Sequence, residues 1–114
     1  MGRIRHSVVI PTYNQAQFIA RALDSVLYQA DDQTEIVVVD DGSTDNTGEV
    51  VASVAGPISY VRTANHGPAA ARNRGVKESR GEFVLFLDSD DALLSDAMDR
   101  LRLAQERWPA ADIF

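Results

Sequence analysis

The run Ile36-Val37-Val38-Val39-Asp40-Asp41-Gly42-Ser43 places two acids directly after four apolar residues. Four residues are too few for an ordinary helix, and the lack of polar alternation is typical of a strand buried on both faces. A second run, Phe83-Val84-Leu85-Phe86-Leu87, has the same form and leads into Asp88-Ser89-Asp90-Asp91. If both strands belong to one parallel sheet, both acidic clusters lie at its carboxyl edge, where open α/β sheets bind ligands.

Similar segments alternate along the rest of the chain. Alternating strands and helices predict parallel β–α–β units with right-handed crossovers. The predicted fold class is therefore α/β, with a mainly parallel sheet and helices on both faces. We expect strands near 7–10, 35–39, 58–62 and 83–87, and helices near 15–29, 45–55, 68–79 and 95–107.

Local signals define the helices further. Asn14 is the expected N-cap of the first helix, with Gln17 three residues later. Pro68 suits the first position of the third helix, whose small residues allow a close approach to the sheet or to a ligand. The last helix carries a predicted apolar stripe of Ala97, Leu101, Ala104 and Trp108.

Composition limits the classes of function. The 114 residues are enough for one domain, and 45% hydrophobic with 25% charged residues is ordinary for a soluble globular protein. A net charge of −6 with scattered basic residues makes a nucleic-acid partner unexpected. The chain has no cysteine, which excludes disulfides and thiolate metal sites. It also has no run of 18 apolar residues and no signal peptide, so we expect no membrane segment in it.

Carboxylates that converge at one sheet edge repel one another unless a cation compensates them. Asp88 and Asp90 flank one small residue, so both can reach a single hard cation, which would be Mg²⁺ or Mn²⁺. Asp91 fits a turn or a helix cap as well as a functional role. At the first cluster, at least one of Asp40 and Asp41 is expected to bind a ligand, by accepting from a base N–H or a ribose hydroxyl.

Other polar residues are candidates for the same edge. Arg72 and Asn73, near the start of the third helix, could donate to a nucleotide. Tyr13, in Pro11-Thr12-Tyr13-Asn14 after the first strand, could stack on a base. His66 fits a solvent-facing loop position better than a ligand or base. Neither a Gly-x-Gly-x-x-Gly fingerprint after the first strand nor a P-loop motif occurs.

Four segments taken together closely resemble family 2 glycosyltransferases. Their order and spacing match the family from about residue 7 to residue 100. The segments are Val8-Val9-Ile10-Pro11-Thr12-Tyr13-Asn14, Val39-Asp40-Asp41-Gly42-Ser43-Thr44-Asp45, Asn65-His66-Gly67-Pro68-Ala69-Ala70-Ala71-Arg72-Asn73 and Phe86-Leu87-Asp88-Ser89-Asp90-Asp91.

The resemblance implies the GT-A fold and transfer of a sugar from a nucleoside diphosphate donor, UDP by expectation, with inversion and with help from Mn²⁺ or Mg²⁺. It implies that Pro11 and Tyr13 line the base pocket and that Asp41 accepts from the base. Asp88 then lies near the ribose, and Asp90 holds the metal. Arg72 and Asn73 complete the expected nucleotide-binding set.

Family members are longer, and their general base follows the Asp-x-Asp strand. We therefore expect residues 1–114 to be the nucleotide-sugar-binding portion of a catalytic domain whose acceptor half is absent. We expect this portion to be inactive alone and cytoplasmic, and the inner membrane face is left open as a location of the parent protein. Ala111-Asp112-Ile113-Phe114 resembles the start of a fifth strand, and self-association is expected to cover an open sheet edge. The acceptor remains open. The alternatives are a non-catalytic nucleotide-sugar-binding module and a receiver-like phosphotransfer domain.

Overall fold

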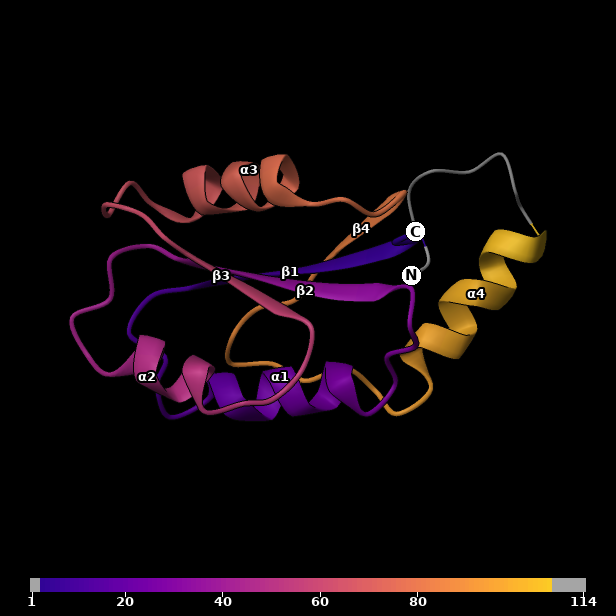
Figure 1. Ribbon diagram of the computed structural model, residues 1–114, viewed down its shortest axis with the longest axis horizontal. Coiled ribbons are helices and arrows are strands. Elements are labelled where there is room, and N and C mark those ends of the chain that lie inside the picture. The colour runs from indigo at the N-terminus through magenta and orange to yellow at the C-terminus, as the bar shows by residue number, and fades with distance from the viewer. Residues whose placement is uncertain (1–2, 108–114) are drawn as a thin grey trace.

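A computed structural model of the chain describes residues 3–107 as a sheet with helices packed around it (Figure 1). The predictions for Trp108 and for the segment 111–114 lie outside the described residues. The strands are β1 (His6–Thr12), β2 (Thr34–Asp40), β3 (Ile58–Arg62) and β4 (Phe83–Phe86), and the helices are α1 (Ile19–Leu27), α2 (Thr47–Ala52), α3 (Pro68–Glu78) and α4 (Ala97–Arg107).

All four strands are parallel and lie in the order β3-β2-β1-β4, which confirms the predicted α/β class. Thr12 pairs with Asp40, and Asp40 pairs with Arg62, so β1, β2 and β3 end at the same level. β4 pairs with the first half of β1, from His6 opposite Phe83 to Val9 opposite Phe86. The segments that follow β1, β2 and β4 therefore all leave the sheet at its carboxyl edge.

Helices cover both faces of the sheet, as predicted (Figure 1). On one face, α1 and α2 pack against alternate residues of β1 and β2, including Val8, Ile36 and Val38. On the other face, Ala71 of α3 packs against Val9, Val37 and Val39. Each central strand thus contributes its side chains to two cores, which explains why β1 and β2 lack polar alternation.

β4 departs from the prediction of burial on both faces. Its four residues are at best half-buried, and Phe86 is 46% exposed. Among residues 3–107, β4 pairs only with β1 and so lies at an edge of the sheet. An apolar run alone does not distinguish an edge strand from a central one.

Asn14 is not the N-cap of α1, which corrects the prediction. The helix begins at Ile19, five residues later, and Phe18 precedes it as the cap residue. Asn14 instead has a φ of 51° and uses its Oδ1 to accept hydrogen bonds from the backbone N–H groups of Thr44 and Asp45. The side chain therefore joins the loop after β1 to the loop after β2.

The predicted close approach of α3 is confirmed at Gly75. A Cβ atom at this position would lie 2.2 Å from Val9 Cγ1, well inside the contact distance. Only a residue without a side chain permits this spacing between helix and sheet. The start of α3 at Pro68 is confirmed as well.

α4 lies beyond the amino ends of the strands rather than over a face of the sheet (Figure 1). Its most buried residues are Met98 and Gln105, whereas Leu101 and Ala104 of the predicted stripe are half-buried. Gln105 Oε1 lies 3.1 Å from Nε2 of the buried His6 at the start of β1. Because α4 lies beyond the ends of the strands, its most buried residues differ from those of the predicted stripe.

Candidate functional site

A pocket of about 360 Å³ lies at the carboxyl edge of the sheet. It collects residues from the ends of β1 and β2, from the start of α3 and from the loop after β4, all of which the parallel topology brings to one edge. Six of the seven predicted site residues line it. The lining residues are Pro11, Thr12, Tyr13, Gln15, Asp41, Asn65, Gly67, Pro68, Ala71, Arg72, Asp88, Ser89 and Asp90.

Asn73 is the predicted site residue that does not line the pocket. Ala71 is buried against the sheet and Arg72 lines the pocket, whereas Asn73 is exposed on α3. Successive residues of a helix point about 100° apart, so the three neighbours face the sheet, the pocket and the solvent in turn. Adjacency in the sequence did not bring Arg72 and Asn73 to the same place.

Asp40 lies in the interior of the protein. It is fully buried, and its Oδ1 accepts a hydrogen bond of 2.8 Å from the backbone N–H of Ser43. Its Oδ2 accepts from the Tyr60 hydroxyl and from Arg62 Nη1, the latter at 3.4 Å. Burial of Tyr60 and its hydrogen bond to Asp40 raise the pKa of the phenol. Asp40 therefore fastens β2 to β3 and to the following turn.

Asp41 lines the pocket and also accepts hydrogen bonds from the loop that forms one of its walls. Its Oδ1 accepts a hydrogen bond of 2.8 Å from the N–H of His66, and its Oδ2 accepts one of 2.9 Å from the N–H of Gly67. A carboxylate has about four acceptor sites, so each oxygen can accept a further bond. Gly42 follows with a φ of 79°, a backbone conformation that glycine adopts without steric cost in a turn.

The second acidic cluster forms a tight turn in which the N–H of Asp91 donates to the carbonyl of Asp88 at 3.0 Å. Carboxylate oxygens of Asp88, Asp90 and Asp91 lie within 4.8 Å of one another, and all three side chains are exposed. Ser89 between them is buried. Asp91 does not cap α4, because that helix begins six residues later at Ala97.

Polar groups that the sequence prediction missed complete the pocket. Thr12 Oγ1 and Gln15 Oε1 are buried atoms without a hydrogen-bond partner among the described residues, and both side chains line the pocket. Buried polar atoms are normally paired, so these two are available to a ligand. Thr12 carried a signal in the sequence, since a hydroxyl at the end of an apolar strand has no role in the core.

A second hollow of about 360 Å³ lies on the other side of the loop that precedes α3. His66 lines this hollow rather than the main pocket and is exposed, as expected from its loop position. The guanidinium groups nearby are already paired, Arg62 with Asp40 at 3.4 Å and Arg74 with Glu78 at 3.4 Å. The hollow is lined by Arg62, Thr63, Ala64, His66, Ala70 and Arg74.

The comparison with known families gives one match that covers most of the chain. The model of the family described as "Glycosyl transferase family 2" matches residues 7–112. An uncharacterized glycosyltransferase of Rickettsia felis is 41% identical over 103 residues, which cover 88% of this chain and 17% of that protein. The chain thus spans about a sixth of the length of this curated relative.

Solved structures share the fold. The structure of Staphylococcus aureus TarS residues 1–349 in complex with UDP-GlcNAc is 34% identical, with a TM-score of 0.83, and the match covers 91% of this chain and 32% of that one. The mannosyltransferase PcManGT from Pyrobaculum calidifontis, in complex with GDP-Man and Mn²⁺, is 32% identical, with a TM-score of 0.75, over 86% of this chain and 31% of that one. Within residues 3–107, every helix is too short or too polar to span a bilayer.

Proposed function

Because this chain belongs to glycosyl transferase family 2, we propose that residues 1–114 form the nucleotide-sugar-binding portion of a glycosyltransferase. The observation that carries the proposal is the pocket itself. It unites Tyr13, Asp41, Arg72 and Asp90, which come from four separate segments of the chain. A nucleoside diphosphate can use each of these groups. The aromatic ring can stack on the nucleobase, the Asp41 carboxylate can accept a hydrogen bond from it, the Arg72 guanidinium can bind the phosphates, and the Asp90 carboxylate can bind a metal ion.

A divalent cation fits the acidic loop. Three carboxylates within 4.8 Å of one another offer the hard oxygen ligands that Mg²⁺ and Mn²⁺ prefer. In our proposal Asp90 is the principal ligand, with Asp88 beside it near the ribose. The bound cation would neutralise charge on the diphosphate as it leaves. The complex of PcManGT with Mn²⁺ supports this assignment by analogy.

The base is assigned to the β1–β2 side of the pocket. Tyr13 is 43% exposed, which leaves its ring free to stack on a flat ligand. Asp41 would accept from a base N–H through the acceptor sites that His66 and Gly67 leave open. Pro11 contributes an apolar wall. We propose UDP as the nucleotide, supported by the TarS complex with UDP-GlcNAc, whereas the PcManGT complex contains a guanine nucleotide.

We propose an inverting transfer. Inversion requires a base that deprotonates the acceptor hydroxyl. We do not assign Asp41, Asp88 or Asp90 as this general base, because in our scheme each of them binds the donor nucleotide or its metal ion. Arg72, whose guanidinium group can bind phosphate through two parallel hydrogen bonds, is assigned to the phosphates.

Calorimetric titration of the chain with UDP, with and without Mn²⁺, tests the proposal. We expect binding that Mn²⁺ strengthens and that UDP-GlcNAc shares. Absence of any nucleotide binding would overturn the assignment of the pocket. Equal affinity in Mn²⁺ and in a chelator would overturn the metal assignment alone.

A further inference from the structure

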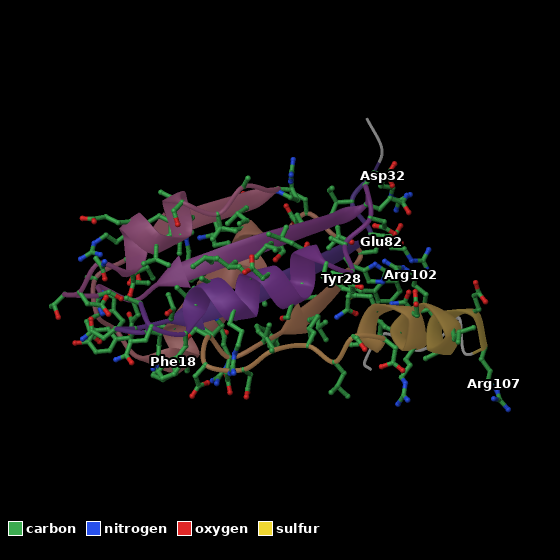
Figure 2. All side chains as sticks on the ribbon, turned by 90° about the horizontal axis from the view of Figure 1, so that it is seen from below. Phe18, Tyr28, Asp32, Glu82, Arg102 and Arg107 are labelled. Atoms are coloured by element: carbon green, nitrogen blue, oxygen red, sulfur yellow. The ribbon has the colours of Figure 1, made fainter. Side chains whose placement is uncertain are left out.

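A polar stripe on α1 holds the segment that carries the acidic loop. Arg21, Ser25 and Gln29 recur at four-residue spacing and therefore lie along one side of the helix and its C-terminal extension. The segment 88–98 runs alongside α1 in both views (Figures 1 and 2). We refer to these three side chains as the α1 polar stripe.

Each member of the stripe bonds to backbone rather than to a side chain of this segment. Arg21 Nη2 donates to the carbonyl of Asp90 at 3.1 Å. Ser25 Oγ accepts from the N–H of Leu93 at 2.9 Å. Gln29 Nε2 donates to the carbonyl of Leu94 at 2.6 Å.

The far end of the stripe reaches the start of α4. Gln29 Oε1 accepts from the N–H of Met98 at 2.9 Å, so its amide group bonds to the segment in both directions. Leu93 packs against the core formed by α1 and the sheet, which adds an apolar contact between the hydrogen bonds. Four hydrogen bonds therefore connect one side of α1 to the backbone between Asp90 and Met98.

We propose that Arg21, Ser25 and Gln29 are positioning residues for the metal-binding loop 88–91, an inference that rests on the proposed function. A cation at this loop requires the carboxylates of Asp88 and Asp90 to face one point. Ordering a flexible loop costs entropy at the moment of binding, and a loop held in advance avoids that cost. The stripe holds the backbone on the downstream side of Asp90, where no strand pairing supports it.

Because Arg21 is positively charged, the direction in which its removal changes Mn²⁺ affinity tests the proposal. A guanidinium group close to Asp90 repels a cation, so charge alone predicts that loss of Arg21 strengthens Mn²⁺ binding. Positioning predicts the opposite, because the loop loses a backbone contact. Arg21→Met removes both the charge and the donor, and Arg21→Lys retains both.

Ser25→Ala and Gln29→Met separate the remaining contacts from charge, because neither alters the net charge. Ser25→Ala leaves the N–H of Leu93 without its partner. Gln29→Met keeps the length of the side chain and removes both hydrogen bonds to the segment. Lys77→Ala, at the opposite end of α3 from the pocket, is the matched control for loss of one positive charge.

Two readouts decide the proposal, namely Mn²⁺ affinity from titration followed by electron paramagnetic resonance, and hydrogen exchange at the amides of Leu93 and Met98. We expect Arg21→Met, Ser25→Ala and Gln29→Met each to weaken Mn²⁺ binding by roughly two- to tenfold, the factor expected for one ordinary hydrogen bond. Arg21→Lys should restore most of the affinity. The Leu93 amide should exchange faster in Ser25→Ala, and the Met98 amide faster in Gln29→Met, while amides of β2 keep their protection and report an intact fold.

Mn²⁺ affinity that is unchanged in Ser25→Ala and Gln29→Met, or increased in Arg21→Met, would overturn the positioning role while leaving the metal site intact. Failure of the unmutated chain to bind Mn²⁺ would overturn the metal assignment and this inference together. The two failures are therefore distinguishable.

Discussion

Asp40 and Asp41 are adjacent in the chain but lie on opposite faces of the sheet. Side chains alternate along a strand, so Asp40, the last residue of β2, shares the face of Val38, which packs under α1. Asp41 follows the strand, and its carboxylate accepts hydrogen bonds from the backbone just before α3, which covers the other face. Asp40 is fully buried among hydrogen-bond donors, whereas Asp41 is 5% exposed and lines the pocket. Mutation of Asp41 is therefore expected to affect ligand binding most, and mutation of Asp40 to affect stability most.

Asp41→Asn is expected to weaken UDP binding by about 1–3 kcal/mol, the usual cost of leaving a buried partner unpaired. The new amide group also places a donor opposite the N–H of His66 or Gly67, which already donate to this side chain. Calorimetry with UDP, GDP and ADP measures both affinity and base preference. Equal competition by all three nucleotides on the unmutated chain would contradict the uracil assignment.

Asp40→Asn is the matched control for this substitution. It should lower the free energy of unfolding, because the partners of a fully buried carboxylate lose their charged acceptor. UDP affinity of the folded fraction should change less than in Asp41→Asn. Urea denaturation followed by circular dichroism gives the stability of both variants.

Asp90→Asn should abolish the dependence of UDP binding on Mn²⁺. The substitution is nearly isosteric and removes the charge that holds a hard cation. Titration with Mn²⁺ in the presence and absence of UDP measures the effect. Asp24→Asn, on the exposed side of α1, serves as the control for loss of one negative charge, and an Asp90→Asn variant that retains full Mn²⁺ dependence would exclude Asp90 as a ligand.

Gly75→Ala should destabilise the chain by about 1–3 kcal/mol, although alanine ordinarily favours a helix. The added Cβ meets Val9 Cγ1 at 2.2 Å, so α3 must move away from the sheet. The double variant Gly75→Ala with Val9→Ala removes the clashing atom and should show favourable coupling in a double-mutant cycle. Additive losses in chemical denaturation would show that helix and sheet are not in close contact here.

Stability should fall in acid partly through Glu35. This side chain is 3% exposed, and burial pushes its pKa up, but hydrogen bonds from Ser7 and from Arg80 together outweigh burial and lower the pKa. A lowered folded-state pKa adds stability above the ordinary value of 4.5, and this contribution is lost as the pH falls through the folded-state value. Glu35→Gln should therefore lose less stability than the unmutated chain between neutral pH and acid, as urea denaturation measures, with the exposed Glu106→Gln as control. An identical acid loss in Glu35→Gln would exclude this carboxylate.

The chain is expected to self-associate through β4, which pairs only with β1 among residues 3–107. An edge strand can pair with a second copy through its outward backbone groups, and the half-exposed Phe86 adds an apolar side chain there. Light scattering across a concentration series should detect a dimer or a larger species, and Phe86→Lys should shift the equilibrium toward the monomer. A clean monomer at high concentration would contradict the prediction.

Much of the fold could be predicted because the sequence patterns have simple physical causes. The apolar runs 36–39 and 83–87 predicted parallel strands, and Pro68 predicted the start of α3. The patterns could not show that β4 lies at an edge, because burial depends on what packs against a strand. They also could not show that Asn14 bridges two loops, because its partners at Thr44 and Asp45 are about thirty residues away.

The pocket was predictable in outline for a similar reason. Parallel strands bring their carboxyl ends to one edge of the sheet. Residues that follow the strands closely, including Tyr13, Asp41 and Asp90, are therefore expected near one another. Which side of a helix a residue occupies depends on the exact helical phase, and Asn73 misses the pocket for this reason. Gln15 was overlooked because an unpaired buried atom is a property of three-dimensional packing.

The strand order also sets the distance between β2 and β4, the strands that lead into the two acidic clusters. β1 separates β2 from β4, and neighbouring strands lie about 4.8 Å apart, so the two strands that lead into the acidic clusters are about 10 Å apart. An elongated ligand lying across the end of β1 can contact the segments that follow both strands. The width of one intervening strand therefore favours a ligand long enough to span this edge of the sheet.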